Sequence, residues 1–353
     1  MTSGLTGRAL SRRTLLAGAV APAGAVVGGG LAGDPVTPPT GPHQPGIVTA
    51  QLPYLSLAGF DVVAPGRDAL AALLRTWTAL AEGLMAAGGC TVTVGFGPAL
   101  FAPGRYGLAG RRPAALVPLP PFRGEALDPA AGGGDLCVQA CAGTPTAAHQ
   151  AVRTLLNATR PLAALRWRQT GFVAQDGTTD PRNLFGFRDG TANLDVRDPA
   201  ETAAHLWVDD GPEWLHGGTY LVARRIRLLL DTWDRMPVGD QEATIGRRRD
   251  SNRRFAAGPA AHAPLASPER NGGAKLLRRP YSYDAGVDPN GLMDAGLIFI
   301  CFQRDPGRQF VPIQRRLAAS DALNAFSQHR ASGVFACPPR QATGSWLGAE
   351  LLS

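Results

Sequence analysis

Two kinds of hydrophobic spacing alternate along this chain, and the alternation restricts it to a fold that mixes helices with strands. Residues 68–86 carry apolar side chains every three or four positions, the spacing of a helix with one buried face. Residues 90–96, CTVTVGF, alternate instead as a strand does. The 44 glycines and 30 prolines add frequent turns, which argues against a helical bundle.

The same two patterns extend over most of the sequence. Further strands are predicted at residues 47–52, 60–63, 135–142, 165–173, 219–227 and 296–303. Further helices are predicted at residues 147–156, 228–234 and 313–326. Together these elements form two α+β halves of similar size. The predicted organisation is a leader and linker over residues 1–45, an N-terminal half over 46–200 and a C-terminal half over 201–353.

The charge pattern does not indicate a nucleic acid as the partner. The formal net charge is +7, and Lys275 is the single lysine among 35 basic residues. The one dense basic run, RRRDSNRR at residues 247–254, lacks the interleaved aromatic residues that binders of single-stranded nucleic acid use. A basic loop of this kind is usually solvated. We therefore expect no nucleic-acid partner.

The cysteines predict neither disulfides nor a zinc site. They occur at positions 90, 137, 141, 301 and 337, without a CxxC pair. Cys137 and Cys141 would share one face of a strand at a distance of about 13 Å, which is too far for a disulfide. Their expected role is that of small core residues.

The N-terminal residues indicate an export signal. Within residues 7–31, Arg12 and Arg13 precede Leu15, Leu16 and a run rich in glycine and alanine. This pattern resembles a twin-arginine signal, and its apolar run is too weak and too interrupted for a convincing membrane span. We therefore expect passage through the twin-arginine translocase and an extracytoplasmic location: secreted, cell-envelope or periplasmic. A short N-terminal anchor is the alternative.

The segment GFRDGTAN at residues 186–193 contains a candidate acid/base residue. Asp189 stands between Arg188 and Gly190, so the backbone can turn sharply there and aim the carboxylate away from its own element. An Asp-Gly pair is also an ordinary turn signal. This segment alone leaves both interpretations open.

His262 is the second candidate. It lies in a loop-like segment with proline and glycine on both sides, which ends in Arg278 and Arg279. A lone histidine is more often a structural residue than a metal ligand. His216, beside a glycine pair, is the strongest rival by position.

An ordered set of segments is distributed along the chain between residues 43 and 306. They are HQPGI at 43–47, TVTVGFGPALF at 91–101, GGDLCVQACA at 133–142, RWRQTGF at 166–172, PRNLFGFRDGTAN at 181–193, GGTYLVARRIRLLLDTWDR at 217–235, LRRPYSYDAG at 277–286 and DAGLIFICFQRDP at 294–306. In these segments the chain resembles the dye-decolourising peroxidases, a haem-enzyme family that includes proteins described as deferrochelatases. The resemblance implies an α+β fold of duplicated ferredoxin-like domains with antiparallel sheets, of the dimeric α+β barrel type, and haem b (iron protoporphyrin IX) as the cofactor.

The resemblance also implies roles for particular residues. His262 matches the proximal iron ligand, and Asp189 matches the distal acid that moves protons on the bound peroxide. Arg278 matches a haem contact that stabilises developing negative charge. Asp294 matches a carboxylate that accepts a hydrogen bond from the ligand histidine. The other implied haem contacts are Gly190, Thr191, Ala192, Ser267, Pro268 and Glu269.

The chain departs from its relatives at two places near these residues. Pro280 stands where some relatives have an asparagine that assists the distal site, so that role is not carried over. Ala263 and Pro264 replace a β-branched and a basic residue. Both departures bear on the charge of the haem pocket and on access to it.

The expected activity is the reduction of hydrogen peroxide coupled to the oxidation of bulky organic donors such as dyes or phenols. Surface-linked aromatic residues are one route for the electrons, although packing is the commoner role of buried Trp and Tyr. One alternative is a haem-handling or iron-uptake protein of the deferrochelatase kind, without significant peroxidase turnover. Another is a secreted binding module without haem. A homo-oligomer is compatible with all three.

Overall fold

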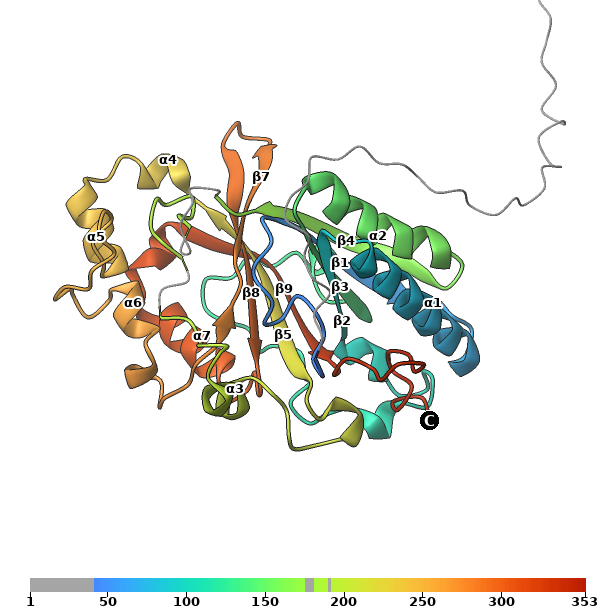
Figure 1. Ribbon diagram of the computed structural model, residues 1–353. Helices are drawn as coiled ribbons and strands as arrows, with labels where there is room; N and C mark the ends of the chain where they lie inside the picture. Colours follow the sequence, from blue (N-terminus) through green and yellow to red (C-terminus); the bar gives the residue numbers. More distant parts are fainter. Residues whose placement is uncertain (1–40, 175–180, 190–191) are drawn as a thin grey trace, which may run out of the picture. The chain divides into compact units, whose positions relative to one another are not determined.

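A ring of antiparallel strands forms the centre of the protein, as a computed structural model shows (Figure 1). The structure describes residues 41–174, 181–189 and 192–353. The predicted twin-arginine segment, with Arg12 and Arg13, lies outside the described residues. Within the described residues, no helix is both long enough and apolar enough to cross a membrane.

The first half of the ring is a four-stranded sheet in the order β2-β3-β1-β4. Its strands are β1 (Tyr54–Val62), β2 (Cys90–Phe96), β3 (Leu136–Ala142) and β4 (Ala163–Phe172). The connecting helices are α1 (Arg67–Ala86) and α2 (Pro145–Thr159). Every neighbouring pair is antiparallel, and Leu57 of β1 lies between Gln139 of β3 and Gln169 of β4. This β-α-β-β-α-β arrangement is ferredoxin-like.

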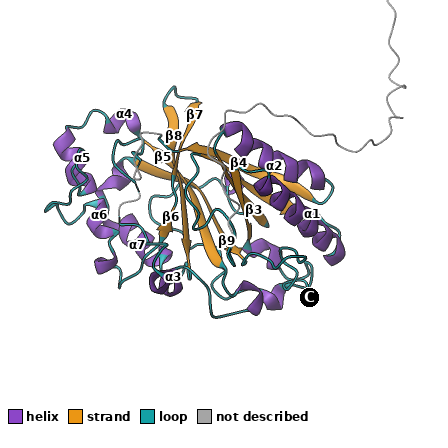
Figure 2. Cartoon of the chain, in the orientation of Figure 1, coloured by secondary structure: helices purple, strands orange, loops and turns teal. Residues whose placement is uncertain are grey.

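The second half repeats the strand order as β9-β5-β8-β7. Its strands are β5 (Thr219–Leu228), β6 (Leu277–Arg278), β7 (Tyr281–Val287), β8 (Met293–Gln303) and β9 (Ser327–Cys337), with β6 added beside β8. Its helices are α3 (Pro199–His205), α4 (Leu230–Trp233), α5 (Val238–Ile245), α6 (His262–Leu265) and α7 (Phe310–Ser320). Helices α4 to α7 gather beside this half, whereas α1 and α2 cover the first (Figure 2). The duplicated ferredoxin-like fold with antiparallel sheets is therefore confirmed.

The two sheets join at two short contacts. Phe96 of β2 pairs with Ala336 of β9, and Phe172 of β4 pairs with Ser282 of β7. Since β5 also pairs with β8, the strands close into a ring. Closure leaves few free strand edges.

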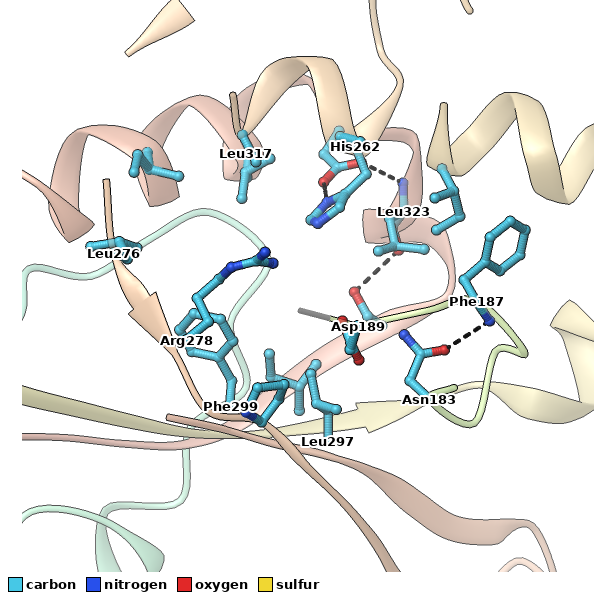
Figure 3. Close-up of a pocket in the computed structure, with 18 of the residues that line it drawn as sticks. Asn183, Phe187, Asp189, His262, Leu276, Arg278, Leu297, Phe299, Leu317 and Leu323 are labelled. Carbon is cyan, nitrogen blue, oxygen red and sulfur yellow. Dashed lines mark hydrogen bonds and ion pairs between the residues drawn. The ribbon is translucent and has the colours of Figure 1, made fainter. Parts of the chain in front are cut away.

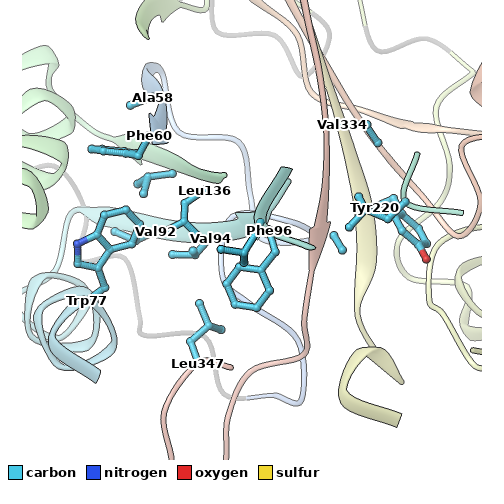
Figure 4. Close-up of a cluster of buried hydrophobic side chains, with 14 of the residues drawn as sticks. Ala58, Phe60, Trp77, Val92, Val94, Phe96, Leu136, Tyr220, Val334 and Leu347 are labelled. Atoms are coloured by element: carbon cyan, nitrogen blue, oxygen red, sulfur yellow. The ribbon is translucent and has the colours of Figure 1, made fainter. Parts of the chain in front are cut away.

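Alternation along the strands fills a core on each of their two faces, and a third apolar cluster surrounds Trp233 of α4. Phe60, Val92 and Val94 pack under α1 and α2 with Trp77, whose Nε1 donates to Oγ1 of Thr159 at 2.9 Å (Figure 4). The opposite strand faces fill the inside of the ring; among their residues are Leu55, Leu57, Cys137, Cys141, Ile300 and Phe335. All five cysteines are buried and free, as their spacing predicted.

Several predicted elements differ from the observed ones. Residues 47–52 do not form a strand. The predicted helix over residues 313–326 is α7, which ends at Ser320 and is followed by a 3₁₀ helix, Ala322–Ala325. Strands β7 and β9 had no predicted counterpart.

Candidate active site

A large hollow lies between the second sheet and the helices beside it. Its empty space, counted together with the part that is open to solvent, is about 1730 Å³. Leu297 and Phe299 of β8 line one wall, and Leu317 of α7 lines the other (Figure 3). Pockets lined mainly by apolar groups, with a few polar side chains, are typical sites for large organic ligands.

His262 is held in this hollow by a carboxylate. Its Nδ1 lies 2.6 Å from Oδ2 of Asp321. The other oxygen of Asp321 accepts a hydrogen bond from the backbone of Leu323 at 2.8 Å. Ala322 N donates to Ala260 O at 2.9 Å, which ties the two segments together. With Nδ1 committed to Asp321, Nε2 is the nitrogen of His262 that can bind a metal.

The environment of His262 has two opposing electrostatic effects. Burial lowers the pKa of His262, but the charge and the hydrogen bond of Asp321 outweigh it, so the net shift is upward. The histidine side chain is 33% exposed, whereas that of Asp321 is only 3% exposed. The protein therefore encloses the carboxylate but leaves the ring facing the hollow.

The prediction that Asp294 accepts a hydrogen bond from His262 is wrong. Asp294 Oδ2 lies 2.7 Å from Arg225, and its Oδ1 accepts a hydrogen bond from the hydroxyl of Tyr283 at 3.2 Å. Side chains of a strand alternate between two faces, and Leu297 and Phe299 occupy the face of β8 that lines the hollow. Asp294 is an odd number of residues away from both, so its side chain lies on the opposite face of β8.

Asp321 did carry a sequence signal. An aspartate directly after a helix commonly caps the next helical turn, and Asp321 caps the 3₁₀ helix Ala322–Ala325 in this way.

Asp189 reaches the hollow from a short hairpin. Arg182 and Arg188 form an isolated antiparallel bridge, and the backbone turns at Gly186, which has φ +82°. Asp189 N donates to Pro181 O at 2.9 Å. The described turn therefore precedes Asp189, which lines the hollow. Gly190, which was predicted to form the turn, lies outside the described residues.

Arg278 is positioned by a residue of the same segment. Asn193 Nδ2 donates to Arg278 O at 2.8 Å, and Arg278 N donates to Asn193 Oδ1 at 2.8 Å. This reciprocal pair attaches the GFRDGTAN segment to β6. Asp189, Arg278 and His262 then project into one space (Figure 3). The sequence did not predict this role of Asn193, although a side-chain amide can satisfy both backbone groups of a distant residue.

Some of the remaining predicted haem contacts line the hollow and others do not. Ala192, Ser267 and Pro268 line the hollow, whereas Glu269 is absent from its described lining. Thr191, like Gly190, lies outside the described residues. The rival ligand His216 is exposed, with Nε2 3.1 Å from Gly211 O, and does not line the hollow.

A buried charged cluster, which the sequence did not reveal, borders the hollow. The Arg224 side chain is 1% exposed and pairs with Glu125. Burial lowers the pKa of Arg224, and Glu125 opposes this effect. His329 also lines the hollow, where burial and then the charge of Arg224 lower its pKa to about 3. It is therefore neutral at ordinary pH.

These residues fit a haem. Three or more metal-binding side chains do not cluster anywhere in the described part of the chain. A porphyrin itself supplies most of the ligands of its iron, so a single protein ligand such as His262 suits it. Its flat apolar ring suits walls such as Leu297, Phe299 and Leu317.

Two family profiles match the chain. The Dyp-type peroxidase N-terminal profile matches residues 44–173, and the corresponding C-terminal profile matches residues 180–342. The chain belongs to the Dyp-type peroxidase family. It is thus a haem-dependent oxidoreductase, as the sequence segments predicted.

Individual relatives agree over most of the chain. The dye-decolorizing peroxidase of Thermobifida fusca is 36% identical over 89% of this chain and 84% of its own length. A deferrochelatase of Escherichia coli O157:H7 is 30% identical over 88% of this chain and 86% of its own. The structure of ferric DtpA from Streptomyces lividans superposes with a TM-score of 0.85 at 38% identity, covering 90% of this chain and 97% of DtpA. Fold and sequence therefore lead to the same family.

Proposed function

We propose that this peroxidase reduces hydrogen peroxide with Asp189 and Arg278, at a haem held by His262, and oxidises bulky organic donors such as dyes or phenols. The observation that carries the proposal is the convergence of these three side chains on one hollow, with His262 already bound through Nδ1 to Asp321. A histidine held by a carboxylate is a common arrangement for a metal ligand.

Each residue then has a defined task. When bound to His262, haem would supply the iron and the redox chemistry of the reaction. Asp189 accepts the proton of the inner peroxide oxygen and returns it to the outer oxygen, which leaves as water. Arg278 remains protonated and stabilises the negative charge on the departing oxygen. Asp321 orients the His262 ring and makes it more electron-donating.

Substitution of the distal residues tests this assignment. We expect Asp189→Asn and Arg278→Leu to lower kcat/KM for peroxide by about 10²- to 10⁴-fold while the Soret band remains. Arg270→Leu is the control, because Arg270 is exposed and does not line the hollow. His262→Ala should lose the Soret band. Full activity in Asp189→Asn would contradict the proposal.

The names of the deferrochelatase relatives support a second candidate function, which is the removal of iron from haem. Haem-loaded protein can be incubated with a reductant instead of peroxide. Iron removal would release metal-free protoporphyrin, which fluoresces strongly. Fluorescence growing without peroxide, together with slow dye oxidation, would favour haem handling over peroxidase activity.

We further propose export by the twin-arginine translocase, supported by Arg12, Arg13 and the apolar run after them. This route carries folded proteins, and the five free, buried cysteines suit folding in a reducing compartment. A fusion of residues 1–45 to a reporter protein should leave the cytoplasm, and replacing both arginines with lysine should retain it. Equal export of both fusions would contradict the proposal.

A further inference from the structure

Asp189 and Arg278 face one space but reach it from segments that are far apart in the chain (Figure 3). Asp189 follows the short hairpin of residues 182–188, whereas Arg278 belongs to β6, the last strand in the sheet order. A proton acceptor and a cation that act on the same small molecule have to be held at a defined separation. A contact that fixes one segment against the other is therefore needed.

Asn193 makes this contact in the way a neighbouring strand would. Arg279 N donates to Ile300 O of β8 at 2.8 Å. Alternate residues of an antiparallel strand direct their backbone groups to opposite sides, so Arg278 directs its N–H and C=O away from β8. The side-chain amide of Asn193 bonds to both groups, each at 2.8 Å. A single side chain thus takes the place of a paired strand at this position of β6.

Neighbouring contacts make Asn193 a fixed point. Leu194 is 4% exposed and Leu277 of β6 is 3% exposed, and both belong to one apolar cluster. On the other side, the N–H of Asp189 donates to Pro181 O at 2.9 Å. The segment of Asp189 is therefore attached before and after the carboxylate, and its second attachment is to β6.

We propose that Asn193 is a positioning residue of the peroxide reaction, which holds Asp189 and Arg278 at the separation at which both act on one molecule of peroxide. Asn193 is absent from the described lining of the hollow, so it acts through these two residues. A shift of about 1 Å between reacting groups can cost about 10²-fold in rate. The inference rests on the proposed peroxidase function.

Removing the amide tests this role in the haem-loaded enzyme. Asn193→Ala should lower kcat/KM for peroxide about 10- to 100-fold and leave kcat/KM for the donor guaiacol unchanged, because only the peroxide step uses the pair. The Soret band confirms that each variant holds haem. Gln51→Ala is the matched control and should keep both values. Gln51 Nε2 donates to Pro280 O at 2.8 Å, a bond of the same kind to the same segment that does not involve the segment of Asp189.

Asn193→Asp provides a rescue that depends on pH. A protonated carboxyl group has a donor and an acceptor, as the amide does, so it can bind the C=O and the N–H of Arg278 together. An ionised carboxylate can only accept and would face the carbonyl oxygen of Arg278. The ratio of Asn193→Asp to wild type in kcat/KM for peroxide should therefore rise as the pH falls from about 7 to about 4, where a carboxyl group takes up its proton. Asn193→Ala should show no such rise.

A double-mutant cycle separates positioning from general damage. Asp189→Asn removes the proton acceptor, so its correct placement has little left to contribute. Adding Asn193→Ala to Asp189→Asn should lower kcat/KM for peroxide by less than about threefold. If Asn193→Ala costs the same factor in both backgrounds, or if Gln51→Ala matches its effect, the positioning role is overturned. An unchanged kcat/KM for peroxide in Asn193→Ala overturns it as well.

Cyanide binding keeps this inference distinct from the proposed function. Hydrogen cyanide loses a proton when it binds ferric haem as an anion, so its association rate depends on a proton acceptor and a cation at one place, without turnover. Asn193→Ala should slow this association about tenfold, measured by stopped-flow absorbance, and Gln51→Ala should not. Slower association supports the positioning role even where the wild type does not oxidise guaiacol. Equal rates in Asn193→Ala and wild type contradict it even where guaiacol is oxidised.

Discussion

Asp321 performs two tasks with its two carboxylate oxygens. One oxygen accepts a hydrogen bond from the backbone of Leu323, and the other lies 2.6 Å from His262. Since the cap fixes the carboxylate, the carboxylate in turn fixes the orientation of the imidazole. Part of the proximal geometry is thus set by an ordinary capping interaction.

Replacing this carboxylate tests its influence on the iron. Asp321→Asn loses the negative charge, so His262 becomes a weaker electron donor. We expect a more positive reduction potential of the bound iron and a loss of about 10- to 100-fold in kcat/KM for peroxide. Asp294→Asn is the matched control, because Asp294 contacts Arg225 and Tyr283 instead. The interpretation fails if the control variant shows the larger effect.

His329 supplies a prediction about pH. Its pKa is lowered from 6.5 to about 3 by burial and then by Arg224, and its Nδ1 has no hydrogen-bond partner among the described residues. Between these pH values the unfolded chain binds a proton that the folded chain does not. The free energy of unfolding should therefore fall as pH drops from 6.5 towards 3, by at most about 1.4 kcal/mol per pH unit.

His329→Phe removes this titratable group and should therefore flatten the pH dependence of the free energy of unfolding. Urea unfolding of both haem-loaded proteins at pH 7, 6 and 5 measures it, since contributions shared by the two proteins cancel in the difference. His149→Gln is the control because His149 is exposed. An unchanged slope in His329→Phe would show that His329 titrates normally in the folded state.

At the scale of the element, the sequence predicted the helices and strands that pack against an apolar core. Strand β2 and helix α1 were located almost to the residue, because their hydrophobic spacing faces a core. Strand β9 was missed because its first half, with Gln328, His329 and Arg330, is polar and His329 lines the hollow. Residues 47–52 are mostly apolar, but side chains and not a strand ladder hold their backbone; for example, Arg279 Nη1 donates to Thr49 O at 2.7 Å.

The site residues likewise divide into those that a local segment of the sequence identified and those that depend on contacts between distant segments. The segments that resemble the family include Asp189 and Arg278, and the resemblance also implied His262; all three residues line the hollow. Asp321 was missed because its pairing with His262 spans 59 residues and depends on how α6 and α7 meet. Contacts of this kind depend on tertiary packing, which the spacing within one segment does not encode.

Gly296 gives a prediction about one element. It lies in β8 opposite Arg227 of β5, and a Cβ added there would overlap the backbone oxygen of Ile226. Backbone cannot move aside as a flexible side chain can, so Gly296→Ala should lower the free energy of unfolding by about 1–3 kcal/mol.

The contrast is Gly239→Ala in α5, where an added Cβ meets nothing within 4 Å. This substitution should stabilise the protein by about 0.5 kcal/mol, because alanine loses less backbone entropy than glycine. Urea unfolding of the two haem-loaded variants and of the wild type measures whether each substitution raises or lowers the free energy of unfolding. Equal stability of the two variants would contradict the close approach of β5 and β8.

At the scale of the whole molecule, the sheets touch through short pairings, and side chains reinforce their union. Phe96 with Ala336 and Phe172 with Ser282 are the strand contacts between the halves. Glu125, from the connection between β2 and β3, reaches across to Arg224 of β5. The same guanidinium lies 5.5 Å from the ring centre of Phe122. One buried cation therefore links the first half to the wall of the hollow.

A double-mutant cycle on Glu125 and Arg224 tests this link. Their side chains are 6% and 1% exposed, so Glu125→Leu leaves a buried guanidinium without its carboxylate. This should cost about 3–5 kcal/mol in the free energy of unfolding. The double variant Glu125→Leu/Arg224→Met removes both charges and should recover most of that loss. Urea is the suitable denaturant, because guanidinium chloride would screen the pair. If the double variant loses as much as the two single variants combined, the pair does not join the halves and the strand contacts alone hold the ring closed.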